Sequence, residues 1–473
     1  MKSAARKDVE SMPLVHSVQR PSHERSTFLT AFGLLGYCCL LATAGIFSSK
    51  RISSPQTTIN LDEETLCDAT PQTSGYITLP NKTDDHYFYW FFESRSNPSS
   101  IKLDAPGPPE SQSPCAVAPD GDSTMRKAIS WTNNASVLWV DQPTGTGYSY
   151  NSPTDFDTTE AQIGANMVAF LARWLDQFPA YKSRPFFIAG ESYAGQYIPV
   201  IATAIVASPS FPEINLQGIA LGNAYVSDIQ AAHDTDLLRD NAYNLTLMTE
   251  SEFEQYKANV THVKELGVEC LTRKNVSACA ELGRIRRDSV LVPLLTVCRV
   301  NPYNMLEPPV FGPNGSVDLL ARPDTIAAQK FLNLPHVQQR LGVHPGLTWR
   351  ITAPDVGKHL LPSVNVDYEH IVASLLHRHI RVLVYAGDSD LVCNWKGCEA
   401  WTLHMEWPGK RAFNEAPEES FVLQGENAGV YRTAHNLTFF RVFRAGHMVP
   451  TNQPAVALAM MNRFMANERL SPE

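Results

Sequence analysis

Six residues, 190–195, restrict the folds open to this chain more than any other feature of its sequence. They read Gly-Glu-Ser-Tyr-Ala-Gly and lie between the apolar run 185–189 and a helix-like stretch. The sequence therefore predicts a strand, a sharp turn and a helix at this place. A Gly-x-Ser-x-Gly turn in that context holds its serine in a strained conformation, and its glycines let strand and helix approach closely. Ser192 is thus the candidate nucleophile.

Short apolar runs alternate with helix-like stretches along most of the chain. The predicted strands cover residues 87–93, 136–140, 186–189, 216–221, 381–385 and 438–443, and the predicted helices cover 162–178, 194–207 and 455–465. Such alternation predicts an α/β protein with a largely parallel sheet. The alternation breaks between about residues 226 and 335, where polar helix-like stretches such as 247–266 indicate an inserted cap.

Residues 28–47 form an uncharged apolar stretch of 20 residues, which is the length that a helix needs to cross a bilayer. Five Lys or Arg residues precede it and only Lys50 and Arg51 follow closely, so the charge bias places the N-terminus in the cytosol. A cleaved signal peptide is the alternative, because Ala42-Thr43-Ala44 has the small-x-small form of a cleavage site. A buried core helix is a third interpretation. Both leading interpretations place the rest of the chain in the secretory pathway, as a type II membrane protein or a secreted one with a luminal, vacuolar or extracellular catalytic domain.

The expected organisation follows from these features. It comprises a cytosolic tail (1–27), a transmembrane signal-anchor or signal peptide (28–47), a polar stalk (48–70), a first core part (71–225), the cap insertion (226–335) and a second core part (336–473). A composition of 44% apolar and 18% charged residues fits a globular protein. The formal charge of −9 disfavours nucleic acid as a partner.

Glycosylation and disulfide signals agree with a luminal location. Seven Asn-x-Ser/Thr acceptors predict N-linked glycans, at Asn81, Asn134, Asn244, Asn259, Asn275, Asn314 and Asn436. Of nine cysteines, two lie in the apolar stretch and seven outside it, so at least one of the seven should be unpaired. Cys270 and Cys279 are the best local pair, although spacing alone does not fix the connectivity.

A serine nucleophile needs a histidine base, and the base needs a carboxylate that fixes its tautomer. In the predicted fold these groups follow the serine in the order acid, then histidine. Asp388 and Asp390 lie in the loop after strand 381–385, and His447 lies in the loop after strand 438–443. The ends of parallel strands meet at one edge of a sheet, so these loops should gather near Ser192.

Four sequence blocks together resemble those of the serine carboxypeptidases, α/β-hydrolase peptidases that remove C-terminal residues. The blocks are DQPTGTGYSY (141–150), GESYAGQY (190–197), GDSDLVCNW (387–395) and GHMVP (446–450). The resemblance covers about residues 75–465, and it implies an α/β-hydrolase fold with a mostly parallel central sheet and a cap. It makes Ser192 the nucleophile, His447 the base and Asp390, rather than Asp388, the partner of that base.

The resemblance also implies further site residues and a substrate class. The backbone N–H of Tyr193 would be one oxyanion donor, Glu191 would help to hold the terminal carboxylate of a peptide, and Cys393 would be a thiol close to the site. Two carboxylates in contact cannot both stay ionised cheaply, so peptide binding should be favoured at acid pH. The implied substrates are peptides or proteins with a free C-terminus, and neither a metal nor an organic cofactor is implied. Acyl transfer to another hydroxyl or amine is compatible with the same scaffold.

One family block is missing from this sequence. Members carry W-[LN]-x-G-G-P-G-C-S-S before the DQP block, where this chain reads IKLDAPGPP at 101–109. In the family that glycine pair supplies the second oxyanion donor, and losing one donor costs roughly a hundred- to a thousandfold in kcat. The block also carries a carboxylate-binding side chain and the cysteine that would pair at the position of Cys298. Three explanations stay open: a gene model that lost part of an exon, an active enzyme with a rebuilt loop, and an impaired protein that binds or stabilises luminal partners.

Overall fold

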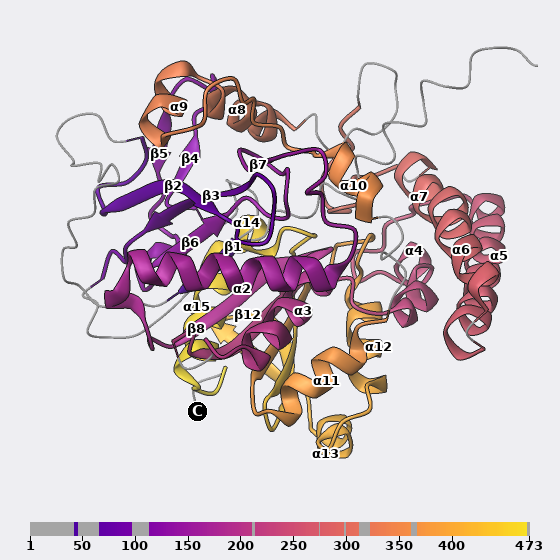
Figure 1. Cartoon of the computed structure of the whole chain (residues 1–473). Coiled ribbons are helices and arrows are strands. Elements are labelled where there is room, and N and C mark those ends of the chain that lie inside the picture. Colours follow the sequence, from indigo (N-terminus) through magenta and orange to yellow (C-terminus); the bar gives the residue numbers. More distant parts are fainter. Residues whose placement is uncertain are drawn as a thin grey trace, which may run out of the picture.

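One twisted sheet forms the centre of the computed structural model, which describes residues 42–45 (backbone only), 66–96, 113–210, 213–273, 275–297, 299–311, 322–360 and 367–470. Within these residues an 11-stranded sheet has the order β11-β12-β13-β10-β9-β8-β1-β6-β3-β2, with β7 beside β3 (Figure 1). The strands are β1 (Ala42–Gly45), β2 (Gln72–Thr78), β3 (Asp85–Phe92), β6 (Val137–Val140), β7 (Tyr150–Asn151), β8 (Phe186–Glu191), β9 (Leu216–Gly222), β10 (Arg381–Gly387), β11 (Glu419–Leu423), β12 (Glu426–Ala434) and β13 (Leu437–Val442). A separate hairpin pairs β4 (Cys115–Val117) with β5 (Thr124–Arg126).

The strands β8, β9, β10 and β13 form the parallel part of the sheet, each pairing in parallel with its neighbour. Helices link these strands, as the alternating sequence pattern predicted. The flanking pairs β12–β13 and β3–β6 are antiparallel, so the sheet is mixed. Because parallel neighbours end at the same edge, the loops after β8, β9, β10 and β13 lie together.

Helices cover both faces of the sheet (Figure 1). On one face α2 (Glu160–Gln177), α3 (Ala194–Ala207) and α11 (Glu369–His377) share a core with Ile188 and Val384. On the other face α15 (Pro454–Ala466) packs against the residues that precede these two in the same strands, Phe187 and Leu383. This alternation is the period-two pattern of a strand buried on both sides. Each fully buried large apolar side chain contributes roughly 1.5–3 kcal/mol relative to its exposed state.

The helix predicted at 162–178 is α2, which begins two residues earlier. Thr159 and Gln162 form a capping box, in which each side chain bonds the other residue's backbone N–H. The remaining helices of the core are α9 (Pro335–Leu341), α10 (Pro354–Leu360), α12 (Trp395–His404), α13 (Lys410–Glu415) and α14 (Val449–Asn452).

The described helices that lie within the predicted cap, residues 226–335, form two groups. α4 (Asp236–Arg239), α5 (Glu250–Gly267), α6 (Val276–Arg286) and α7 (Val292–Val297) lie together at one side of the sheet (Figure 1). Their buried residues share a cluster with Leu391, in the loop that follows β10. α8 (Pro323–Leu332) instead packs with α9 against Phe88 and Tyr148. The described helices of the predicted cap therefore contact the core at two separate places.

The expected stalk does not extend to residue 70. Leu66 is buried, and Cys67 forms a disulfide with Cys115 across a Cα–Cα distance of 5.5 Å. Burial raises the pKa of Asp68, but hydrogen bonds and charge from Arg95 and from Arg126 outweigh it, so the pKa lies below its ordinary value. Residues 66–70 thus belong to the folded domain, because a disulfide and a buried ion pair attach them to distant segments.

The apolar N-terminal stretch enters the structure only as strand β1. This strand lies between β6 and β8 and pairs antiparallel with both. The sequence predicted a helix-like membrane or signal segment over 28–47, so at residues 42–45 the structure differs from that prediction. The rest of the stretch lies outside the described residues. Among the described residues, no helix combines the length and the apolar character that crossing a bilayer requires.

A buried pair of carboxylates ties β3 to the loop after β7. The Thr144 hydroxyl lies 2.6 Å from Asp85 Oδ2 and 3.1 Å from Asp157 Oδ2, so its single proton is held between the two carboxylates. Lys82 Nζ lies 3.6 Å from Asp85 and 2.9 Å from Asp157. Burial raises the pKa of Asp85 to about 6, with Asp157 and Asp155 adding repulsion and Thr144 and Lys82 opposing it.

We expect Asp85→Asn to stabilise the protein at neutral pH. The folded-state pKa of Asp85 lies above the unfolded value near 4, so the contribution of Asp85 to the free energy of unfolding falls as pH rises from about 4 to 6. The amide removes this dependence, and the gain at pH 7 relative to pH 4 should be about 1–3 kcal/mol. Chemical denaturation at both pH values measures it.

Asp155→Asn is the matched control. Burial raises the pKa of Asp155, but backbone N–H donors and Ser152 lower it further, so the net shift is downward. Its stabilising contribution is present above the unfolded pKa and is lost as pH falls, so this variant should lose stability at pH 7 and little at pH 3. An equal effect of Asp85→Asn at pH 4 and pH 7 would contradict the interpretation of the buried pair.

Candidate active site

Ser192 lies on a sharp turn between β8 and α3. Its φ is +62°, in the left-handed region that non-glycine residues rarely adopt. Its N–H donates to Gly222 O at 3.0 Å, and its carbonyl accepts from Tyr225 N at 2.9 Å. A Cβ at Gly195 would lie 2.6 Å from Tyr225 O, so only glycine fits there. The predicted strand, turn and helix are all present, and the turn presents Ser192 at the end of β8.

His447 and Asp390 meet in the buried interior beside this edge. His447 Nδ1 lies 2.7 Å from Asp390 Oδ2, and both side chains are almost fully buried. Because Nδ1 is engaged with the carboxylate, proton exchange with a serine hydroxyl would use Nε2. The sequence placed these two residues on different loops, and the structure brings them together.

Three N–H donors hold the Asp390 carboxylate in place. Val392 N donates to Oδ1 at 2.9 Å, and Cys393 N donates to Oδ2 at 3.2 Å. The third donor is the side-chain amide of Asn223, at 2.8 Å from Oδ2. With His447 as a fourth contact, the carboxylate has one fixed orientation.

Asn223 is a site residue that sequence reasoning missed. Besides its bond to Asp390, its Oδ1 accepts from Gly387 N at 3.0 Å, so its amide joins the ends of β9 and β10. The available signal was its position, directly after the strand Leu216–Gly222 whose end shares an edge with β8.

Asp388 has different partners. Tyr243, from the segment between β9 and β10, donates its hydroxyl to Asp388 Oδ1 at 2.6 Å, and Arg444 N donates to the same oxygen at 2.9 Å. Arg441 Nη2 lies 3.6 Å from Oδ2. Burial raises the pKa of Asp388 against these interactions. The structure thus places Asp390 beside His447 and gives Asp388 a contact with the inserted segment.

The remaining predicted site residues also lie at this edge. Glu191 is the buried last residue of β8, and Tyr193 is the N-cap of α3. The Tyr193 hydroxyl donates to Glu160 Oε1 at 2.9 Å. Cys393 and Cys398 are buried and stand outside disulfides, which agrees with the expectation of at least one unpaired cysteine. Burial raises the pKa of the Cys398 thiol far above its ordinary value.

Other cysteine predictions have mixed outcomes. Cys270 is disulfide-bonded, but the side chain of Cys279 lies outside the described residues, so the Cys270–Cys279 pair stays a prediction. The Cys67–Cys115 disulfide was not predicted.

The DQP block folds around the carboxylate of Asp141. Tyr148 N donates to Oδ2 at 2.8 Å, and burial raises the Asp141 pKa to about 7 against this bond and one from Trp349. Gly147 has φ +56°, and a Cβ there would lie 2.1 Å from the carboxylate. Glycine at this position of the block is therefore required by the close approach of Asp141.

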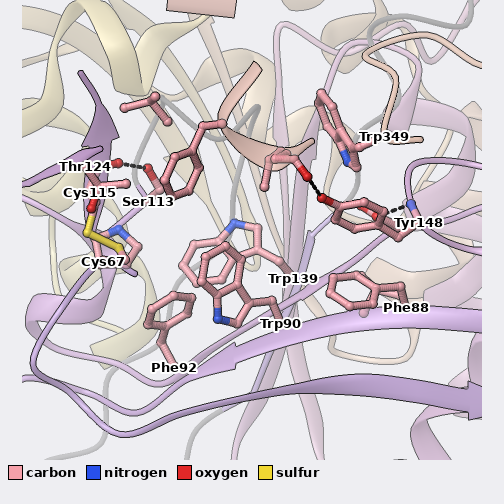
Figure 2. Close-up of a pocket in the computed structure, with 16 residues that line it drawn as sticks. Cys67, Phe88, Trp90, Phe92, Ser113, Cys115, Thr124, Trp139, Tyr148 and Trp349 are labelled. Atoms are coloured by element: carbon pink, nitrogen blue, oxygen red, sulfur yellow. Dashed lines mark hydrogen bonds between the residues drawn. A yellow bond between two sulfur atoms is a disulfide. The ribbon is translucent and has the colours of Figure 1, made fainter. Parts of the chain in front are cut away.

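An aromatic pocket lies on the sheet face opposite α2. It has a volume of about 120 Å³ and is lined by Trp90, Phe92 and Trp139, with Tyr148 and Trp349 at one end (Figure 2). The Cys67–Cys115 disulfide closes the other end (Figure 2). Ser192, Asp390 and His447 are not part of its wall. Ser113 does line the pocket. It is the residue at which the described chain resumes after the segment with the missing block.

The parallel strands, the strained serine at the end of β8 and the acid and histidine on later strand ends define a class: the chain has the α/β-hydrolase fold. The crystal structure of Kex1Δp, a prohormone-processing carboxypeptidase from Saccharomyces cerevisiae, superposes with a TM-score of 0.69 at 22% identity. That similarity covers 84% of this chain and 92% of the yeast chain.

Sequence comparison identifies the family. The profile of the serine carboxypeptidase family (Peptidase_S10) matches residues 63–104 and 106–467. A serine carboxypeptidase-like protein of Oryza sativa subsp. japonica is 34% identical over 409 residues, which cover 83% of this chain and 92% of the relative. A carboxypeptidase Y homolog A of Leptosphaeria maculans is 32% identical, with coverages of 85% and 74%. The chain belongs to the serine carboxypeptidase family.

Proposed function

We propose that this protein is a serine-type carboxypeptidase in which Ser192, His447 and Asp390 act as the catalytic triad. The Ser192 hydroxyl attacks the carbonyl carbon of the last peptide bond while His447 Nε2 takes its proton. The histidine then gives this proton to the leaving amine, and an acyl-enzyme remains on Ser192. Water, deprotonated by the same nitrogen, releases the shortened peptide. The single observation that carries this proposal is the buried 2.7 Å contact between His447 and Asp390 at the edge where β8 presents Ser192.

Glu191 is proposed to select a free C-terminus. It is buried and directly precedes the nucleophile, so a bound peptide carboxylate would share a poorly solvated space with it. One of the two carboxylates would then carry a proton, which favours binding at acid pH. This accounts for exopeptidase action on peptides or proteins with a free C-terminus.

The oxyanion site is proposed to use Tyr193 N–H, which begins α3, together with a second donor. The match to the family profile breaks between residues 104 and 106, inside the interval where the sequence lacks the glycine block. That interval lies outside the described residues. A lost exon, a rebuilt loop and an impaired protein therefore stay separate explanations, and sequencing the transcript across residues 100–115 distinguishes the first from the others.

The experiment that tests the function is release of the C-terminal residue from an N-blocked dipeptide by the expressed full chain, between pH 4 and pH 8. We expect kcat/KM to be highest in the acid range, with the same dipeptide bearing a C-terminal amide as a poor substrate. Added amine nucleophiles would reveal acyl transfer as a new product. A folded protein that hydrolyses neither substrate, with a transcript that confirms residues 100–115, would support the luminal binding protein instead.

We also propose that the protein resides in the secretory pathway. The Cys67–Cys115 disulfide supports an oxidising compartment. Asn81, Asn244 and Asn275 are exposed acceptors suited to N-linked glycans, whereas the side-chain amide of Asn259 donates to Ser289 O at 2.8 Å. Membrane anchoring through residues 28–47 and a cap over 226–335 between two core parts are part of the same proposal.

A further inference from the structure

One loop of the inserted segment, residues 301–307, contacts the loop that carries Asp390. The hydroxyl of Ser389 donates to Asn304 Oδ1 at 2.8 Å. Two backbone bonds flank this contact: Met305 N donates to Ser389 O and Leu391 N donates to Pro302 O, both at 2.9 Å. Ser389 and Leu391 are the two chain neighbours of Asp390, so the loop holds the acid from both sides.

The same loop contacts the turn that carries His447. His447 N donates to Tyr303 O at 2.6 Å, and the Tyr303 ring meets the imidazole edge-on with centroids 4.6 Å apart. A Cβ at Gly446 would lie 2.3 Å from Tyr303 O, so glycine is needed for this approach. The loop therefore contacts both the backbone and the ring of the histidine.

Internal hydrogen bonds give the loop a defined shape. Asn304 N donates to Asn301 O at 3.0 Å, and the Asn304 side-chain amide donates to Glu307 Oε1 at 2.8 Å. Asn452, just beyond the histidine turn, donates to the same glutamate oxygen at 3.2 Å. The Asn304 side chain thus accepts a hydrogen bond from Ser389 through Oδ1. Through Nδ2 it donates to Glu307, which also accepts from Asn452 beside the histidine turn.

We propose that loop 301–307 sets the relative position of Asp390 and His447, and that Asn304 is a positioning residue of the active site. Ser389 is fully buried, so its hydroxyl has no water to replace Asn304 as an acceptor. Loss of this bond would let the acid loop shift relative to the histidine turn. A displacement of about 1 Å at a catalytic group can cost on the order of a hundredfold in rate.

The test compares Asn304→Ala with Leu306→Ala, a control in the same loop whose side chain is 42% exposed. If the proposed peptidase function holds, Asn304→Ala should lower kcat about ten- to a hundredfold with KM changed less than about twofold, and Leu306→Ala should change neither. Ser389→Ala removes the same bond from its other end, so adding it to Asn304→Ala should cost little more than either change alone.

The kinetic test rests on the proposed peptidase function. A second measurement, by NMR, tests the role of Asn304 without relying on that function. The proton between His447 Nδ1 and Asp390 should give a downfield proton NMR signal, which would be assigned by its loss in Asp390→Ala. We expect Asn304→Ala to shift or broaden this signal while thermal unfolding shows a folded protein, and Leu306→Ala to preserve it. An unchanged signal in folded Asn304→Ala would overturn the proposal. Because the NMR signal does not depend on turnover, it tests the role of Asn304 even if the protein hydrolyses no peptide.

Discussion

Ser192→Ala is expected to lower kcat for dipeptide hydrolysis by about a millionfold, to the rate left by binding and oxyanion contacts alone. Alanine has no hydroxyl that could form the acyl-enzyme, and the hydroxyl of neighbouring Tyr193 is bonded to Glu160 Oε1. Both residues carry a Cβ, so the unfavourable φ of +62° costs the same in each and the thermal stability should change little. The rate with N-blocked dipeptide at the optimal pH measures the effect.

Ser374→Ala provides the matched control, because Ser374 is an exposed serine of α11 whose hydroxyl bonds only within its own helix turn, to Ile371 O. It should retain full activity. If Ser192→Ala kept more than about a hundredth of the wild-type rate in a preparation freed of contaminating peptidase, covalent catalysis at Ser192 would have to be abandoned.

Asp390→Asn is expected to lower kcat by about ten thousandfold. Asp390 Oδ2 accepts from His447 Nδ1 and also from the N–H groups of Asn223 and Cys393. Oδ1 accepts from Val392 N, so both oxygens of the Asp390 carboxylate face hydrogen-bond donors. An asparagine must turn its own NH₂ toward one of these donors. The arrangement then favours the histidine tautomer with hydrogen on Nε2, which cannot take the serine proton.

Asp388→Asn is the control in the same loop. Asp388 bonds Tyr243 and Arg444 N rather than His447, so its loss should cost less than about a hundredfold. The two variants should therefore differ by at least two orders of magnitude in kcat at equal KM. If the Asp388 variant were the more damaged of the two, the assignment of the acid would have to be reversed.

The sequence allowed the fold and the nucleophile turn to be predicted because both depend on local patterns. Apolar runs located β8, β9 and β10, and small residues on both sides of Ser192 marked the turn. The order of acid and histidine along the chain then pointed to His447 and to the loop that holds Asp388 and Asp390. The family resemblance selected Asp390, which contacts His447 although the two lie 57 positions apart.

Features that depend on long-range contacts were not predictable in this way. Asn223 bonds a carboxylate 167 residues away, and only its position directly after a strand could have marked it. Asn304 bonds a serine 85 residues away, and no local pattern marks it. Residues 66–70 looked like a stalk because they are polar and irregular. Their attachment is fixed instead by Cys115 and Arg95, which lie outside any local window.

The four residues of strand β1, Ala42–Gly45, also lie within the predicted membrane segment 28–47. Ala42–Gly45 cannot lie in a bilayer and between β6 and β8 at once. A chain held in the membrane through residues 28–47, or one cleaved after Ala44, would leave two strand edges facing each other with unpaired backbone groups. Such edges recruit another strand. A membrane-bound or processed form would therefore need another strand between β6 and β8 to keep the sheet continuous.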